Sequence, residues 1–393
     1  MNNFDFCSPT RILFGKNTQK EIGKLIKPYA KKILLHYGNS SIKQNGLYEE
    51  VINSIKTHEI DFVELGGVVP NPRLDLVHEG IKLCQKENIE LILAVGGGSV
   101  IDSAKAIAMG FYYEGNIWNV YETKEEVKKA LPVACILTIP AAGSEVSCHT
   151  VITNEEKKSK YGYGSQILKP ILSIINPEIF FTIPKKQIAN GVSDMISHVF
   201  ERYFTNTEHT DLTDGLCESV VKTIMKNALI VIDDPNNYEA WCEIGFSAMI
   251  AHNDLLGMGR EEDWACHAME HELSAKYDIA HGAGLAILTP NWMEYTCSEK
   301  PNIFAQFSIN MMGVNENRNQ NAVIREGIKR LREFYIKMNL PKTLNDVEID
   351  QTNLEIMAKK AVNFESKKNQ TIGFFKKLHW ENIYEIYKKS LNE

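Results

Sequence analysis

The stretch Leu91-Ile-Leu-Ala-Val-Gly96-Gly-Gly-Ser99-Val-Ile-Asp102 joins an apolar run to a glycine triplet and then to an amphipathic segment. This order predicts a buried strand, a tight turn and the start of a helix. The N–H groups of such a turn and the positive end of the helix attract anions, so we expect a phosphate there. Ser99 and Asp102 have the spacing of a capping box, with Ser99 at the N-cap. A glycine triplet is less specific than G-x-G-x-x-G, and a tight turn without a ligand remains the alternative.

The alternation of apolar runs with amphipathic segments extends over the first half of the chain. It is typical of a mostly parallel sheet flanked by helices. After Pro177 and Pro184 the strand-like runs give way to helical periodicity. We therefore predict an α/β domain over residues 1–184 and an all-helical domain over residues 185–393. The expected strands are 33–37, 61–65, 91–95, 133–139 and 171–175, and the expected helices between them are 20–26, 47–57, 74–87 and 100–109.

A second polar turn follows the first strand of this α/β half. Gly38-Asn39-Ser40-Ser41 directly succeeds the apolar run 33–37, and Lys43 comes two residues later. Small hydroxyl side chains and a lysine suit a phosphate monoester such as the 2′-phosphate of NADP. An acid at this turn favours NAD instead, and Asn39 is not an acid. The turn favours NADP, with a plain polar turn as the alternative.

Histidines gather in the predicted helical half. Asp194 and His198 are four residues apart, so on a helix both side chains face one way. His267 and His271 repeat that spacing, and His281 follows ten residues later. One carboxylate and several imidazoles form a donor set that fits Zn²⁺ or Fe²⁺ with an open position. The alternative is histidines paired with carboxylates for structure alone, the candidates being Glu201, Glu270 and Glu272; for His252 we favour such a structural role.

The bulk properties exclude several classes of protein. The chain has 393 residues and a net charge of −7, and its lysines form no basic stripe, so a nucleic-acid partner is not expected. We find no signal peptide and no apolar run near the ~18 residues of a membrane helix. Eight cysteines without a C-x-x-C pair indicate a reducing compartment. We expect a cytoplasmic protein without a membrane partner.

With these motifs in place, the chain resembles the iron-containing (group III) alcohol dehydrogenases, and within them the NADPH-dependent butanol dehydrogenase-like branch. The resemblance covers almost the whole chain and implies an architecture like that of dehydroquinate synthase. It rests on Pro9-Thr10-Arg11, Phe14-Gly15, Gly38 to Tyr48, Pro70-Asn71-Pro72-Arg73, Gly96 to Asp102, Thr138 to Glu145, Lys160-Tyr-Gly, Asn176-Pro177-Glu178, Asp194 to His198 and His267 to Gly284.

The resemblance also implies roles for particular residues. Two departures from the branch stand out: Gly38-Asn39-Ser40-Ser41 replaces a fuller glycine run, and His149 is bulky where a small residue is expected beside the substrate. The implied ligands of one iron or zinc ion are Asp194, His198, His267 and His281. The implied cofactor-binding residues are Gly38, Ser40, Ser41, Asn71, Gly97, Gly98, Ser99, Asp102, Thr138, Ser144 and Lys160.

We therefore expect a metal-dependent alcohol dehydrogenase or aldehyde reductase that transfers hydride between NADPH, rather than NADH, and small primary alcohols or aldehydes such as butanol and butyraldehyde. His271 is the candidate for proton transfer or substrate orientation. The alternatives are a glycerol-type polyol dehydrogenase, a dehydroquinate synthase-like lyase, and a non-redox binding protein. We also expect a homodimer, in which a β-rich segment from Phe4 to Phe14 could pair with a second copy.

Overall fold

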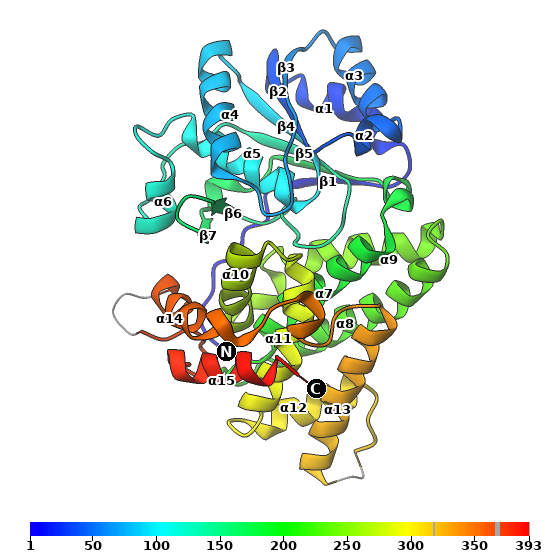
Figure 1. The fold of residues 1–393 in the computed structure, drawn as a ribbon. Coiled ribbons are helices and arrows are strands. Elements are labelled where there is room, and N and C mark those ends of the chain that lie inside the picture. The colour runs from blue at the N-terminus through cyan, green and yellow to red at the C-terminus, as the bar shows by residue number, and fades with distance from the viewer. Residues whose placement is uncertain (317–318, 366–369, 393) are drawn as a thin grey trace. The chain divides into compact units, whose positions relative to one another are not determined.

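The protein is described by a computed structural model over residues 1–316, 319–365 and 370–392 (Figure 1). It contains two compact units, each built from separate segments of the chain. The α/β unit comprises Cys7–Ile183 and Pro235–Met249, and the helical unit comprises Met1–Phe6, Pro184–Asp234 and Ile250–Glu393. Two short segments therefore lie in a different unit from the one that a single division after residue 184 assigns to them.

The α/β unit has a six-stranded sheet in the order β1-β8-β5-β4-β2-β3, with every neighbouring pair parallel. The predicted α/β class with a mostly parallel sheet is confirmed. An antiparallel hairpin, β6 with β7, was missed by the sequence analysis. The strands are β1 Arg11–Phe14, β2 Lys32–Tyr37, β3 Asp61–Leu65, β4 Leu91–Gly96, β5 Val133–Leu137, β6 His149–Asn154, β7 Ser159–Gly164 and β8 Leu172–Ile175.

The sheet is apolar on both faces because helices cover both. Leu35, Leu93 and Ile136 pack with residues of α1 and α3 in one buried cluster. Alternate residues such as Ala94 face the other way and are equally buried. The α/β helices are α1 Ile22–Ile26, α2 Ser41–Gln44, α3 Leu47–Thr57, α4 Leu74–Glu87, α5 Gly98–Gly110, α6 Trp118–Thr123 and most of α9 Tyr238–Ala251, with 3₁₀ turns η1 Thr18–Glu21, η2 Gln166–Leu168 and η3 Pro177–Thr182.

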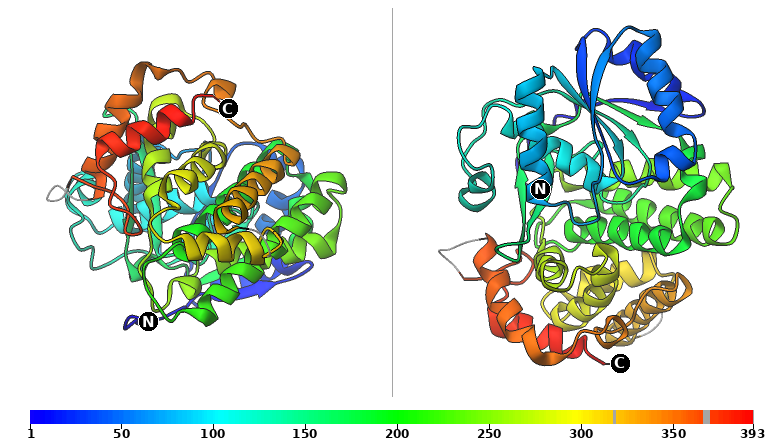
Figure 2. Two further views of the ribbon diagram at one scale, coloured as in Figure 1. Left: turned by 90° about the horizontal axis from the view of Figure 1, so that it is seen from below. Right: turned by 45° about the horizontal axis from the view of Figure 1, so that its top comes forward.

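The helical unit is centred on α7 and α11, which pack against each other. Figure 2 shows its helices from two further directions. Pro184 precedes α7 in an extended conformation, which suits the first turn of a helix. The helices are α7 Lys185–Tyr203, α8 Asp211–Asp233, α10 Ala265–Tyr277, α11 His281–Thr296, α12 Pro301–Asn310, α13 Gln320–Lys337, α14 Leu354–Glu365 and α15 Trp380–Lys389, with 3₁₀ turns η4 Leu255–Gly257, η5 Asn345–Val347 and η6 Gln351–Asn353.

The N-terminal segment differs from the expected β-rich stretch. Only Arg11–Phe14 forms a strand, while the first residues bind the helical unit. The Met1 ammonium donates to the Glu208 carbonyl at 2.7 Å, and the Asn2 amide donates to the Gly259 carbonyl at 2.8 Å. Residues that make these bonds to the helical unit do not form the strand that was expected there. Within the described ranges, no helix has both the length and the apolar character to cross a membrane.

Candidate active site

Asp194 and His198 lie one turn apart on α7, as their spacing predicts. Their side chains are buried, and His198 Nε2 lies 3.3 Å from Asp194 Oδ1. A carboxylate and an imidazole that share one buried helix face can supply two ligand atoms to one ion.

Two other helices bring further imidazoles to the same carboxylate oxygen. His267 lies in the first turn of α10, and its Nε2 is 3.9 Å from Asp194 Oδ1. His281 is the first residue of α11, and its Nε2 is 3.7 Å from that oxygen. Asp194, His267 and His281 each offer a ligand atom within 4.8 Å of the other two. His198 completes the group, since its ring centroid lies 4.5 Å from that of His267. The four predicted ligands are therefore neighbours in the helical unit.

Two buried carboxylates hold the outer nitrogens of these histidines. Glu201 Oε1 lies 2.8 Å from His267 Nδ1 and also accepts from the His267 amide at 3.0 Å. Glu270 Oε2 binds the Nδ1 atom of His281. Each pairing favours a proton on Nδ1 and leaves the Nε2 lone pair toward Asp194. These histidines are thus paired with carboxylates, as the structural alternative requires, and their Nε2 atoms still converge on one oxygen of Asp194.

An arginine and a second imidazole contact His198. His252 stacks on His198 with ring centroids 4.2 Å apart. Arg202 donates to His252 Nδ1 at 2.8 Å and to the His198 carbonyl at 2.8 Å. Its Nε lies 3.2 Å from Glu262 Oε1. His252 is therefore held by Arg202 and stacks on a predicted ligand.

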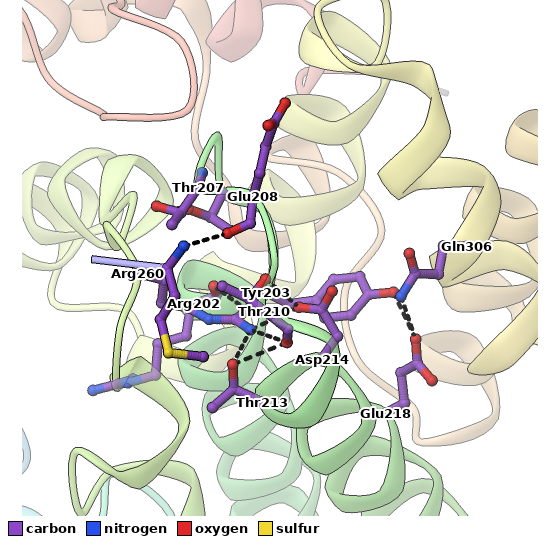
Figure 3. A network of polar contacts seen from close by, with 12 residues as sticks. Arg202, Tyr203, Thr207, Glu208, Thr210, Thr213, Asp214, Glu218, Arg260 and Gln306 are labelled. Carbon is purple, nitrogen blue, oxygen red and sulfur yellow. Dashed lines mark hydrogen bonds and ion pairs between the residues drawn. The ribbon is translucent and has the colours of Figure 1, made fainter. Parts of the chain in front are cut away.

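Arg260 belongs to a neighbouring polar network at the end of α7 (Figure 3). It is buried, and it donates to the Arg202 carbonyl at 3.0 Å and to Asp214 Oδ1 at 2.7 Å. It also binds the Thr213 hydroxyl. A dehydroquinate synthase-like lyase needs basic side chains for a carboxylated, phosphorylated substrate. Arg260 is instead hydrogen-bonded to residues of the helical unit itself. The network argues against that alternative.

His271, the predicted catalytic residue, lies one turn after His267 on α10. It is half-buried, and its ring centroid is 5.6 Å from that of His281. His271, His281 and Glu270 form a second group whose ligand atoms lie within 4.8 Å of one another. His271 is thus beside the predicted metal ligand His281.

The glycine triplet forms the predicted turn between β4 and α5, but its capping differs from the expectation. α5 begins at Gly98 with Gly97 as its N-cap, and no side chain caps it. The predicted capping box of Ser99 and Asp102 is wrong, because Asp102 binds a distant loop. A Cβ on Gly96 would lie 2.3 Å from Val100 Cγ2, so the turn packs too tightly for a side chain. Amide groups of the first turn have no partner within a helix and can meet an anion.

The two predicted phosphate turns are neighbours. β2 pairs with β4, and β3 lies on the outer side of β2, whereas β5 lies on the opposite side of β4. The chain therefore changes direction between β2 and β4, at the kind of switch point where parallel sheets bind dinucleotides. Gly38 follows β2, Ser40 precedes α2 and Ser41 begins it.

Asp102 and Ser144 bind each other, with Ser144 Oγ donating to Asp102 Oδ1 at 2.5 Å. Asp102 Oδ2 accepts from the Val151 amide at 3.0 Å. Burial raises the pKa of Asp102, and the ammonium of Lys105 partly offsets that rise. Lys105 itself, fully buried, donates to the carbonyls of Ser144, Ser147 and His149 at 2.7, 2.8 and 2.9 Å. These bonds fix the loop 143–151 against α5.

The remaining predicted cofactor residues belong to the same unit. The Thr138 amide donates to the Gly96 carbonyl at 3.0 Å, which ties the end of β5 to the glycine turn. Lys160 is buried on β7, opposite Thr153 of β6. Asn71 is buried and adopts φ 54°, a left-handed conformation that asparagine tolerates better than most residues.

Two family models match the chain, over residues 9–177 for iron-containing alcohol dehydrogenase and over residues 188–391 for the C-terminal part of the Fe-containing alcohol dehydrogenase family. The chain belongs to the iron-containing alcohol dehydrogenase family. It is therefore an oxidoreductase of alcohols and aldehydes with a nicotinamide cofactor, and the predicted family and enzyme class are confirmed.

Relatives of this iron-containing alcohol dehydrogenase align along nearly its full length. NADH-dependent butanol dehydrogenase A of Clostridium acetobutylicum is 42% identical over 99% of this chain and 100% of the relative. The NADPH-dependent aldehyde reductase YqhD of Escherichia coli is 32% identical over 92% of this chain and 93% of the relative. The crystal structure of NADH-dependent butanol dehydrogenase A from Thermotoga maritima superimposes with a TM-score of 0.97 at 41% identity, covering 100% and 99% of the two chains.

In this dehydrogenase, Lys105 is a residue of the site region that was not predicted from the sequence. A signal existed, because Lys105 is the one charged residue between Asp102 and the end of α5 at Gly110, and its neighbours are apolar or small. Glu201 and Glu270 were considered only as structural partners of histidine. Each lies three residues after a predicted ligand, which puts its carboxylate near the ligand face of that helix, but the histidine that it binds is on another helix, so the spacing alone does not identify the pair.

Proposed function

We propose that Asp194, His198, His267 and His281 hold one divalent ion, Fe²⁺ or Zn²⁺, in a metal-dependent alcohol dehydrogenase and aldehyde reductase. The observation that carries the proposal is the approach of three imidazole Nε2 atoms to one Asp194 oxygen, at 3.3, 3.9 and 3.7 Å. One carboxylate and three neutral imidazoles fit either ion and leave a net positive charge. When bound, the ion polarises the substrate oxygen as a Lewis acid.

The chain's own residues position the reactants. Glu201 and Glu270 fix the ring planes of His267 and His281, and we propose that the amides at the start of α5 bind the cofactor pyrophosphate. We propose that His271 orients the substrate or passes its proton, since it stands beside His281 and is half-buried. The nicotinamide supplies or accepts the hydride. Replacement of His271 by Gln should then change the pH dependence of kcat, and an unchanged profile would remove His271 from the proton path.

For substrates we propose small primary alcohols and aldehydes such as butanol and butyraldehyde. The support comes from relatives named butanol dehydrogenases at 42% identity over the full chain. The test is oxidation of NADPH and of NADH with butyraldehyde, before and after chelation and after return of Fe²⁺ or Zn²⁺. We expect activity that chelation abolishes and metal restores. Full activity after complete metal removal, checked by elemental analysis, would refute the metal site.

The residue-level test replaces His267 by Ala. The metal content of this variant, measured by elemental analysis, should be less than a tenth of that of the wild type. Addition of NADPH should still quench and shift the protein's fluorescence as in the wild type. A matched control is His78→Ala, which removes a half-buried imidazole of α4 in the other unit, whose Nε2 lies 3.1 Å from Asn116 Oδ1. Metal content equal in His267→Ala and His78→Ala would contradict the assignment.

For the cofactor we propose a preference for NADP(H). Supporting it, the turn 38–41 carries no acid, and Lys43 is held beside it over the rings of Tyr37 and Tyr48, at 5.1 and 4.7 Å. Glu64 accepts hydrogen bonds from the hydroxyls of both tyrosines. A relative at 42% identity is named for NADH and one at 32% identity is named for NADPH. The deciding measurement is therefore the ratio of kcat/KM for the two cofactors. A ratio that favours NADH would overturn the preference.

We propose a homodimer as well. β1 is an edge strand that pairs only with β8 among the described strands, and its last residue, Phe14, is 36% exposed. An open edge with an exposed aromatic residue suits pairing with a second copy. Sedimentation that shows a monomer at micromolar concentration would overturn this.

A further inference from the structure

A pocket of about 590 Å³ lies within the helical unit, bordered by α11, α13, the segment 340–343 and the end of α15. Its volume is typical of sites for small molecules, which span roughly 300 to 1,000 Å³. None of the four proposed metal ligands lines it, and neither does His271. The pocket is thus a separate feature of this unit.

The lining carries an excess of positive charge. Arg332, Lys342, Lys388 and Lys389 line the pocket together with one carboxylate, that of Glu294. The chain as a whole has a net charge of −7, so this surface has the opposite sign to the rest of the protein. Such a local excess attracts small anions.

Part of this charge is held in place and part is uncompensated. Arg332 Nη2 donates to Glu294 Oε1 and to Asn291 Oδ1, both at 3.0 Å, which fixes the guanidinium. Lys388 lies 2.6 Å from Glu385 Oε1. Lys389 makes no ion pair with a carboxylate in the described part of the chain, and its ammonium lies 5.9 Å from the ring centre of Tyr295. Lys389 is exposed and therefore available to pair with a bound anion.

The other walls are apolar. Ala286 of α11 and Leu340 are buried, Pro341 is half-buried, and Ile336 and the ring of Tyr335 add further apolar surface. An inorganic ion alone would leave these walls uncovered. We propose that the pocket binds a small organic anion in which a phosphate or carboxylate group is attached to an apolar body.

The test is titration calorimetry of the full chain with phenyl phosphate and with benzoate, and with benzamide as the uncharged control. At least one anion should bind about tenfold more tightly than benzamide, and added NaCl should weaken that binding. Phenyl phosphate alone would identify phosphate as the group recognised, and benzoate alone would identify carboxylate. No binding of either anion at millimolar concentration would overturn the proposal.

Variants locate the binding. Joint replacement of Lys388 and Lys389 by Met should weaken it about tenfold. Lys329→Met, which removes an exposed lysine from α13 outside the pocket, should leave it unchanged. His267→Ala should also leave it unchanged, which excludes binding of the anion to the metal. Equal affinity in the double variant and the wild type would overturn the proposal. If the double variant does not fold, Lys389→Gln serves in its place, with the thermal midpoint as the check on folding.

Discussion

Lys105→Met tests whether one buried ammonium organises the cofactor side of the α/β unit. The Lys105 side chain is fully buried, and its Nζ lies within 3.0 Å of four oxygens of the segment 144–149. Methionine has a similar length and no donor. The replacement therefore removes the bonds while it nearly preserves the volume.

The expected loss in the free energy of unfolding can be estimated from these contacts. Three N–H groups bind carbonyls of the loop, and each such charged bond contributes about 1.5 to 3 kcal/mol. Against this stands the cost of burying the ammonium, because desolvation lowers the pKa of Lys105 while Asp102 partly offsets that effect. Removal of one partner from a buried charged group usually costs about 3 to 5 kcal/mol. We expect a loss within that range, since Asp102 also loses its cation.

Urea unfolding followed by circular dichroism measures this loss, and hydrogen exchange of the segment 143–151 localises it. The KM for NADPH should rise as well, because Ser144 and the loop lose their anchor. Lys82→Met, at an exposed position of α4, is the control and should change neither quantity. A loss below about 1 kcal/mol together with unchanged exchange in segment 143–151 would refute the reasoning, since that is the size of an ordinary surface change.

Three further outcomes are expected. Burial lowers the pKa of His36 from 6.5 to about 4, so the folded state takes up fewer protons than the unfolded state. The free energy of unfolding should therefore fall by up to about 3 kcal/mol as the pH drops from 6.5 to 4. His36→Gln should flatten that pH dependence, measured by urea titrations at several pH values. Gly96→Ala places a Cβ 2.3 Å from Val100 Cγ2 and should destabilise the protein by about 1 to 3 kcal/mol while it raises the KM for NADPH; equal stability would contradict the close packing. Glu201→Gln should weaken metal binding about 10- to 100-fold in competition with a chromophoric chelator, whereas Glu333→Gln on the exposed face of α13 should not.

Local patterns predicted much of the fold because their physics is local. The run 91–96 is apolar throughout, and a strand covered by helices on both faces needs that composition. Asp194 and His198 could be paired from their spacing, since the pitch of a helix fixes which residues share a face. The β6–β7 hairpin was missed because Lys157 and Lys158 interrupt its pattern and its strands carry polar residues such as Thr150 and Lys160. Its pairing depends on a turn, and the hydrophobic periodicity alone gave no sign of it.

Asp102 shows where local reasoning reaches its limit. Its spacing from Ser99 satisfies a capping box, and that interpretation requires only four consecutive residues. In the folded chain the carboxylate instead accepts from Ser144, 42 positions away, and from Val151, 49 positions away. A buried carboxylate loses its solvation, so it binds where several donors and a cation can replace water, and a helix N-terminus alone offers fewer such partners. Lys105, one turn along the same helix, supplies that cation and fixes the loop that donates. The bonding of Asp102 thus follows from tertiary contacts, which hold Ser144 and its loop against α5.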